Sequence, residues 1–145
     1  METTRLEMKV HDFLAQKRIA VAGVSRDTRN HPAGHLIYQR LKKSGHDVFP
    51  VNPNMQTFEG DRCYRDLRSI PGGVDAVVIA TRPEIAEATM RECAELGIKH
   101  VWMHRGPGPG SVSETAAALG RERDIAVIDG GCPCMFKPTA DFGHK

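Results

Sequence analysis

The chain has 145 residues, of which 40% are hydrophobic and 26% charged, and its formal net charge is +2. These values are typical of one ordinary globular domain with a buried core, and the interleaving of acidic and basic residues argues against a nucleic-acid-binding surface. No apolar run approaches the roughly 20 residues of a membrane span, and the N-terminus lacks the apolar segment of a signal peptide. We therefore expect a cytoplasmic protein with neither a nucleic-acid nor a membrane partner, whose four cysteines are reduced.

The first predicted elements are an amphipathic helix at about residues 3–15 and a short buried strand at 19–22. Gly23 then lets the backbone turn. Pro32 is suited to the first turn of a helix, which is predicted to run to residue 44 and to end with Gly45 in the C′ position. A strand, a glycine turn and a helix start form the first unit of a nucleotide-binding sheet, where the helix N-terminus favours a phosphate.

The loop between this strand and helix departs from the dinucleotide-binding fingerprint. The G-x-G-x-x-G pattern is absent, because Gly23 and Gly34 lie far apart in the sequence. The intervening segment carries two arginines, a histidine and several hydroxyl or amide side chains, which suits a ligand with more phosphate than NAD has. A solvated loop that happens to carry charges is the alternative interpretation.

A second short strand is expected at residues 47–51, and it ends at Asn52-Pro53. In a NAD-binding sheet, an Asp or Glu stands at about this place and holds the ribose hydroxyls. Asn52 can bond a ribose or an adenine edge, or it can simply begin a turn, and both interpretations are open. Residues 54–73 contain no long periodic segment, and we expect only a short helical turn at about 64–69.

The clearest strand is the continuous apolar run at residues 74–80, of the kind that is buried on both faces. It leads into Thr81 and Arg82, and Pro83 is suited to begin the next helix. Cys93 lies on the apolar face of that helix, so we expect it to be a core residue rather than a reactive thiol.

The remaining predicted elements are a strand at 98–103, a loop rich in Gly and Pro, a helix ending at about 123 and a strand at 125–128. Ser111 and Glu114 form an S-x-x-E capping box for the helix. The last strand is followed by the turn Cys132-Pro-Cys134, and we expect the tail at about 137–145 to be mobile.

Strands that alternate with helices predict one α/β domain over residues 1–145. We expect a Rossmann-like, parallel, five-stranded sheet of order 3-2-1-4-5, counted along the chain, with helices on both faces. The loops that follow the strands then meet at one edge of the sheet. Ser25, Arg26, Asn52, Thr81, Arg82 and the cysteine turn lie in these loops.

These segments, in this order, resemble the small single-domain CoA-binding proteins, which are related to the nucleotide-binding domain of succinyl-CoA synthetase. The resemblance covers roughly residues 12–136. It rests on Ala-Val-Ala-Gly-Val-Ser-Arg-Asp at 20–27, Val-Phe-Pro-Val-Asn-Pro at 48–53, Gly-Asp-Arg-Cys-Tyr-Arg-Asp-Leu at 60–67, Val-Asp-Ala-Val-Val-Ile at 74–79, Val-Trp-Met at 101–103 and Cys-Pro at 132–133.

The resemblance implies a Rossmann-like domain that binds coenzyme A. Carried onto this chain, the implied ligand contacts are Gly23, Val24, Ser25 and Arg26 at the phosphates, and Asn52, Pro53, Thr81 and Arg82 near the adenosine. We further expect Arg29 or Arg82 to meet the 3′-phosphate, and Cys132 or Cys134 to lie near the thiol. Two segments depart from the family's pattern. The loop ends in Asn-His-Pro-Ala-Gly rather than Lys-Pro-Gly, and a Gly-Pro-Gly-Pro-Gly run follows the fourth strand.

The expected function is the binding of coenzyme A, or a short acyl-CoA, without chemistry of the chain's own. No Ser or Cys has an obvious paired base and no Walker motif is present. His100 and His104 are the nearest candidates for a phosphohistidine, but each is more typical of a loop or surface position. No metal site is expected, because zinc needs about four ligands and no second cysteine pair stands at the usual spacing.

Two alternatives remain open. The first is an NAD(P)-dependent oxidoreductase, which the fold permits although the glycine fingerprint and the acid after the second strand are missing. The second is a CoA-linked thiol redox protein that uses Cys132 and Cys134. Purely structural cysteines are the simpler account of that turn. A protein partner cannot be identified from the sequence.

Overall fold

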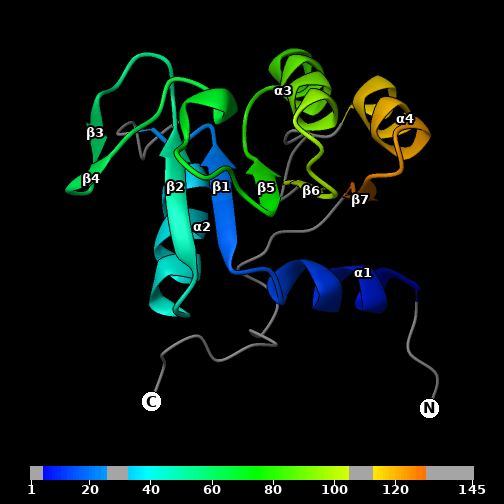
Figure 1. The fold of residues 1–145 in the computed structure, drawn as a ribbon, viewed down its shortest axis with the longest axis horizontal. Helices are drawn as coiled ribbons and strands as arrows, with labels where there is room; N and C mark the ends of the chain where they lie inside the picture. Colours follow the sequence, from blue (N-terminus) through cyan, green and yellow to red (C-terminus); the bar gives the residue numbers. More distant parts are fainter. Residues whose placement is uncertain (1–4, 26–32, 105–112, 130–145) are drawn as a thin grey trace.

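The computed structural model describes residues 5–25, 33–104 and 113–129, which form a parallel sheet covered by helices (Figure 1). The elements in chain order are α1 (Arg5–Leu14), β1 (Arg18–Ala22), α2 (Ala33–Lys43), β2 (Asp47–Val51), β3 (Thr57–Phe58), β4 (Asp61–Arg62), the 3₁₀ turn η1 (Leu67–Ser69), β5 (Ala76–Ile79), α3 (Pro83–Glu95), β6 (His100–Met103), α4 (Glu114–Glu122) and β7 (Ala126–Ile128). The predicted α/β class, the five parallel strands and the helices on both faces are confirmed. The mobile tail predicted at 137–145 lies outside the described residues.

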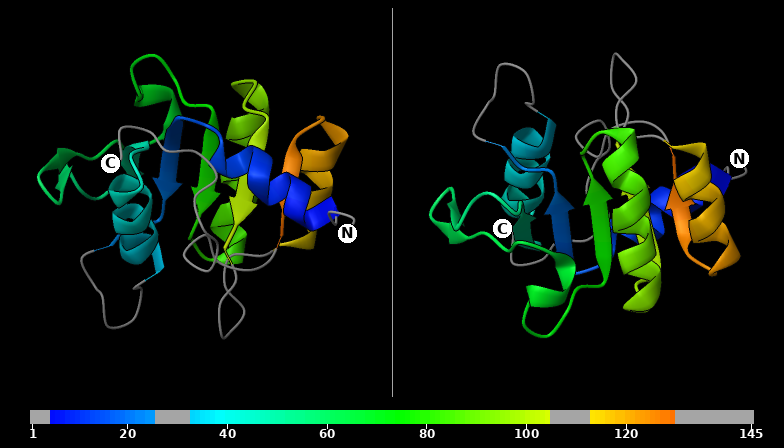
Figure 2. Two further views of the ribbon diagram at one scale, coloured as in Figure 1. Left: turned by 90° about the horizontal axis from the view of Figure 1, so that it is seen from below. Right: turned by 90° about the horizontal axis from the view of Figure 1, so that it is seen from above.

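The helices are divided between the two faces of the sheet. Figure 2 shows α1 in front of the sheet when the molecule is seen from below, and α3 and α4 in front of it when seen from above. Neighbouring residues of one strand pack into opposite clusters, because side chains alternate across a strand. In β6, Trp102 packs with α1 and α2, whereas Met103 packs with α3 and α4. No helix in the described ranges is long and apolar enough to cross a bilayer.

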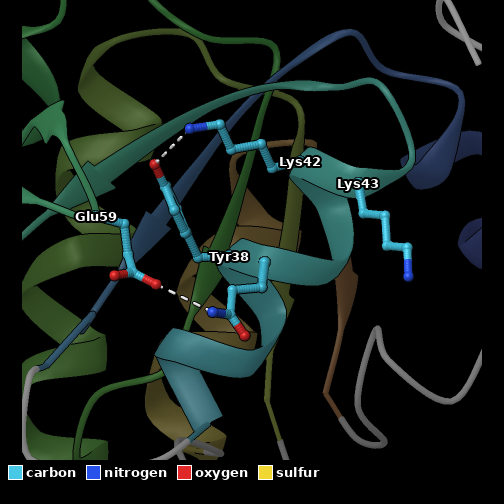
Figure 3. Close-up of a pocket in the computed structure, with 5 residues that line it drawn as sticks. Tyr38, Lys42, Lys43 and Glu59 are labelled. Atoms are coloured by element: carbon cyan, nitrogen blue, oxygen red, sulfur yellow. Dashed lines mark hydrogen bonds between the residues drawn. The ribbon is translucent and has the colours of Figure 1, made fainter.

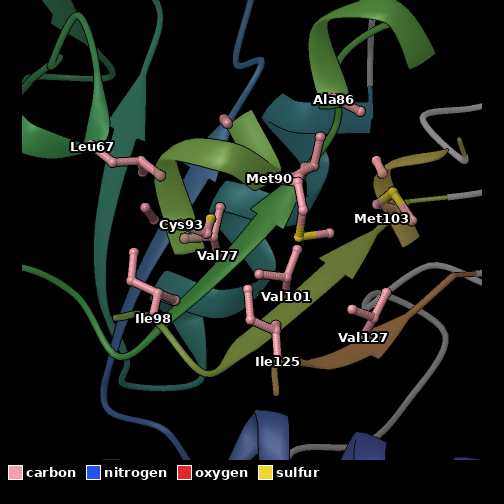
Figure 4. Packing of buried hydrophobic residues seen from close by; sticks show 14 of the residues in the cluster. Leu67, Val77, Ala86, Met90, Cys93, Ile98, Val101, Met103, Ile125 and Val127 are labelled. Atoms are coloured by element: carbon pink, nitrogen blue, oxygen red, sulfur yellow. The ribbon is translucent and has the colours of Figure 1, made fainter. Parts of the chain in front are cut away.

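Both faces of the sheet are closed by dense apolar packing. Beneath α3 and α4, Met90 lies beside Val101, and both residues are fully buried, as is Cys93 (Figure 4). Burial raises the pKa of the Cys93 thiol, so the prediction that this cysteine belongs to the core is confirmed. On the other face, the rings of Phe13 and Trp102 meet edge to face with their centroids 5.4 Å apart.

The order of the strands differs from the prediction. The observed order is β2-β1-β5-β6-β7, which is 2-1-3-4-5 when the five strands are counted along the chain, rather than 3-2-1-4-5. The predicted order would place β2 between two strands, but Pro50 lies within β2 and has no N–H to donate to a second neighbour. The outer side of β2 is instead covered by Tyr64, whose N–H donates to the Pro50 carbonyl at 2.9 Å. The fully buried β5 takes the inner position beside β1.

A small hairpin, β3–β4, occupies the segment where only a helical turn was predicted. Glu59 (φ = +51°) and Gly60 (φ = +82°) form its two-residue turn, and two positive φ angles are typical of a type I′ turn. Phe58 anchors the hairpin on α2, because its buried ring lies edge to face against both His35 and Tyr38. The predicted turn at about 64–69 is present as η1, at its C-terminal part.

The cap of α4 also differs from the prediction. The helix begins at Glu114, and the Ser113 hydroxyl accepts a hydrogen bond from the N–H of Ala116 at 3.2 Å. Ser113 is therefore the N-cap, two residues after the predicted Ser111, which lies outside the described residues. At the end of α2, Gly45 has φ = +93°, as expected for a C′ glycine.

Candidate functional site

The carboxyl ends of the parallel strands form one edge of the sheet, the carboxyl edge. At one point on this edge, the direction in which successive strands are added to the sheet reverses. From β1 the chain goes through α2 to β2 on one side, and it then returns across β1 to β5 on the other side (Figure 1). The connections that leave β1 and β5 consequently run to opposite faces, where α2 and α3 pack. Ligands of open α/β sheets bind at such a reversal, outside the carboxyl ends of the two strands.

Two glycines bring three elements together at this point. Gly23 follows β1 with φ = +101°, and a Cβ there would lie 2.6 Å from the carbonyl oxygen of Ala80, which follows β5. A Cβ on Gly34, in the first turn of α2, would lie 2.6 Å from the Gly23 carbonyl oxygen and 2.9 Å from the Val24 Cα. The glycines that are separated in the sequence are therefore neighbours in space, and only glycine allows these close backbone approaches.

Val24 and Ser25 continue the backbone beyond Gly23. The Val24 side chain is fully buried in the cluster beneath α1 and α2, so only its backbone can face a ligand. Ser25 is partly exposed. Arg26 and Arg29, the predicted cations of this loop, lie outside the described residues, as do Cys132 and Cys134.

Asn52, at the end of β2, connects two loops of the carboxyl edge. Its Nδ2 donates to the Val24 carbonyl oxygen at 2.8 Å, and its Oδ1 accepts from the N–H of Asn54 at 2.8 Å. The second bond is an Asx turn, so the turn interpretation of Asn52 is confirmed. The first bond fixes the loop after β1, a role that the sequence did not predict. Pro53 is exposed beside it.

Thr81 and Arg82 stand at the start of α3. The Thr81 methyl group would be 3.0 Å from a Cβ on Gly23, which places this residue at the reversal point. Arg82 is the N-cap residue of α3 and is exposed. Within the described ranges, its guanidinium has neither an ion pair nor a hydrogen-bonded cap partner. The structure thus gathers Gly23, Val24, Asn52 and Thr81 in one place, with Arg82 adjoining them.

One surface depression lies on another part of the molecule. A hollow of about 550 Å³ is lined by Tyr38, Gln39, Lys42, Lys43 and Glu59, on the flank of α2 that faces the β3–β4 hairpin (Figure 3). Gln39 Nε2 donates to Glu59 Oε1 at 3.0 Å and Lys42 Nζ lies 2.5 Å from Asp61 Oδ2. These interactions hold the β3–β4 hairpin on α2 and occupy the side chains of Gln39, Lys42 and Glu59. We therefore do not assign a ligand site to this hollow.

Comparison with known proteins identifies the family of the chain. Residues 17–138 match the family model described as a CoA binding domain. The alpha subunit of acetate–CoA ligase (ADP-forming) II from Pyrococcus furiosus is 33% identical over 90 residues, which are 61% of this chain and 19% of that subunit. The chain therefore corresponds to less than a fifth of the length of this ligase subunit.

Relatives of similar size exist as well. The uncharacterized protein YneT of Bacillus subtilis is 29% identical over 112 residues, covering 77% of this chain and 78% of that protein. A hypothetical protein from Pyrococcus horikoshii OT3 has the same fold, with a TM-score of 0.79 and 24% identity over 93% of this chain and 95% of that chain. Because the family model spans most of the sequence, from β1 through β7, the chain belongs to the family of CoA-binding domains.

Proposed function

We propose that the protein binds coenzyme A, or a short acyl-CoA, at the carboxyl edge around Gly23 and catalyses no reaction by itself. The observation that carries the proposal is the pair of close backbone contacts that joins Gly23 to Ala80 and Gly34 to Gly23. They hold the start of α2 against the loop after β1, and a helix start offers free N–H groups and the positive end of the helix dipole to a phosphate. Membership of the CoA-binding family supports coenzyme A as the class of ligand.

The diphosphate is assigned to the backbone of Gly23 and Val24, with Ser25 and Arg26. Val24 contributes only main-chain atoms, because its side chain is buried. The bond from Asn52 to the Val24 carbonyl keeps the loop in place before a ligand arrives. Such preorganisation favours binding, since less conformational freedom is lost on association.

The adenosine is assigned to the surface between the ends of β2 and β5, where Asn52, Pro53 and Thr81 lie. Arg82 supports the choice of a ligand with an extra phosphate, because its exposed side chain has no acidic partner among the described residues. A nicotinamide cofactor fits less well. The residue after β2 is an amide rather than an acid, and its Nδ2 already bonds to the protein backbone.

The test is calorimetric titration of the wild type and of Arg82→Ala with CoA, dephospho-CoA and NADP. We expect the wild type to bind CoA more tightly than dephospho-CoA. Arg82→Ala should weaken CoA by about ten- to a hundredfold, the loss expected for a hydrogen bond to a charged group, and should leave dephospho-CoA unchanged. Arg123→Ala, at the exposed C-cap of α4, is the matched control and should change neither ligand.

Two results would contradict these assignments at different levels. No binding of CoA, or tighter binding of NADP than of CoA, would overturn the proposed function. Equal affinities of the wild type for CoA and dephospho-CoA would leave CoA binding intact but show that no arginine reads the 3′-phosphate.

A further inference from the structure

Glu59, in the turn of the β3–β4 hairpin, has a backbone conformation that is costly for its residue type. Its φ is +51°, and among the described residues Asp124 is the only other non-glycine residue with a positive φ. Gly, Asn and Asp adopt this conformation most readily, whereas a longer side chain is strained in it. Strained residues persist where the surrounding structure holds them, and they cluster at functional positions. The contacts of the Glu59 side chain indicate what the strain supports.

The carboxylate of Glu59 contacts two successive turns of α2. Gln39 Nε2 donates to Glu59 Oε1 at 3.0 Å (Figure 3), and His35 Nε2 lies 3.0 Å from the same oxygen. The His35 ring also meets Phe58, the residue before Glu59, edge to face with the centroids 5.3 Å apart. The hairpin therefore holds a side chain that belongs to the first turn of α2.

This first turn is the part of α2 that adjoins the proposed phosphate site. Gly34, next to His35 in the chain, lies against the loop after β1, and a Cβ there would be 2.6 Å from the Gly23 carbonyl oxygen. The helix start is thus held from two sides, by its backbone contact with Gly23 and by Glu59 through His35. Releasing either side would let the free N–H groups of the helix start change their direction.

The base of the hairpin is joined to the other side of the same loop. The N–H of Asn52 donates to the Tyr64 carbonyl at 2.9 Å, and the Cys63 Sγ lies 3.8 Å from the Asn52 carbonyl oxygen. The Asn52 side chain in turn bonds to the Val24 carbonyl. The hairpin consequently connects the start of α2 with the loop after β1 by a route outside the main sheet.

We propose that Glu59 is a positioning residue for the binding of coenzyme A, because it acts through His35 to hold the first turn of α2 in the direction that the phosphates require. This inference rests on the proposed function. In this role Glu59 touches no atom of the ligand, and its negative charge repels an anionic one. Removing the charge should therefore favour binding, whereas removing the contact with α2 should weaken it.

The experiment compares CoA affinity, by calorimetry, with stability, by urea titration, for full-length variants. Glu59→Gly relieves the strained φ but removes the contacts with α2, so the unfolding free energy should change little. Its CoA affinity should fall by about two- to tenfold, the loss expected for one neutral hydrogen bond. Glu59→Gln keeps an oxygen that can accept from His35 and Gln39, and should bind CoA at least as tightly as the wild type. Asp124→Gly, which relieves a similar strain after α4, is the matched control and should not affect CoA.

A double variant tests whether Glu59 acts through His35. In a His35→Leu background, Glu59→Gly should cause no further loss of CoA affinity. The inference is overturned alone if the wild type binds CoA and Glu59→Gly binds it as tightly or more tightly, as a purely electrostatic role requires. It is also overturned if Glu59→Gln loses as much affinity as Glu59→Gly, or if the losses from His35→Leu and Glu59→Gly add in full. Failure of the wild type to bind CoA would instead overturn the proposed function, and this inference with it.

Discussion

Replacing Gly23 by alanine tests the geometry on which the proposed site depends. The substitution has two costs that are separable in the structure. A side chain at φ = +101° is strained. A positive φ costs an L-residue other than glycine about 1–2 kcal/mol. The new methyl group would also meet the Ala80 carbonyl oxygen at 2.6 Å, and overpacking of this kind costs about 1–3 kcal/mol.

The second cost is not easily relieved, because both atoms in contact belong to the backbone. Ala80 is held by its N–H, which donates to the Ala22 carbonyl at 2.8 Å. Moving the loop away from β5 would therefore disrupt the pairing of β1 with β5. We expect Gly23→Ala to lower the free energy of unfolding by about 2–5 kcal/mol in total, and the midpoint of thermal unfolding by about 10 °C.

Two other glycines separate the contributions. Gly97 has φ = +74° and open space around a Cβ, so Gly97→Ala carries strain without contact. Gly34 lies in α2 and would meet the Gly23 carbonyl oxygen at 2.6 Å, so Gly34→Ala carries contact without positive φ. Urea titrations of the three variants decide the matter. If Gly23→Ala is no more destabilising than Gly97→Ala, the close approach of β1 and β5 is refuted.

Four further changes test other parts of the structure. Burial lowers the pKa of His46 from its usual 6.5 by desolvation, so the unfolded chain takes up the proton first and stability should fall as the pH drops below about 6.5. His46→Asn should flatten that fall in urea titrations at several pH values, and an unchanged slope would show that His46 is not its cause. Asp124 has φ = +62° after α4, and Asp124→Gly should raise the free energy of unfolding by up to about 1 kcal/mol; a loss of stability would contradict this. Ser113→Ala removes the cap of α4 and should lower the free energy of unfolding by about 1 kcal/mol, whereas no change would mean that the cap contributes nothing. Mild oxidation with CoA should add the mass of CoA to the wild-type protein through a mixed disulfide at Cys132 or Cys134, and persistence of the adduct in the double serine variant would rule out both thiols.

Most helices and strands were predicted from apolar periodicity and from glycine and proline positions, because these patterns depend only on residues that are close together in the sequence. The bounds of β2 agree with the prediction at both ends, since a short apolar run is enclosed between a C′ glycine and Asn52-Pro53. The β3–β4 hairpin was missed because its strands have only two residues each and its turn contains Glu59 where Asn, Asp or Gly is usual. The anchor of the hairpin, Phe58 on α2, is a long-range contact that no periodicity records.

The sequence predicted which residues lie at the candidate site, but not the contacts that join their loops. The sequence placed Gly23, Asn52 and Thr81 after three strands, and it left open whether Asn52 serves a turn or a ligand. The bond from Asn52 to Val24 depends on β2 lying directly beside β1. Likewise, Gly23 and Gly34 are too far apart in the sequence to match the G-x-G-x-x-G pattern, yet they are neighbours in space. The number of residues in a loop does not limit how closely its ends approach.

Pro50 is a residue from which the strand order could have been predicted correctly. A proline inside a strand removes a donor, and it is tolerated where that side of the strand has no neighbouring strand to bond. β2 must then be an edge strand, which excludes the order 3-2-1-4-5, because that order gives β2 two neighbours. With β2 at the edge, the fully apolar β5 must lie on the inner side of β1. The reversal point then falls between β1 and β5, so Gly23 faces Ala80 and Thr81 rather than the end of a more distant strand. Pro50 makes β2 an edge strand, and this position of β2 in turn determines which loops meet at the proposed ligand site.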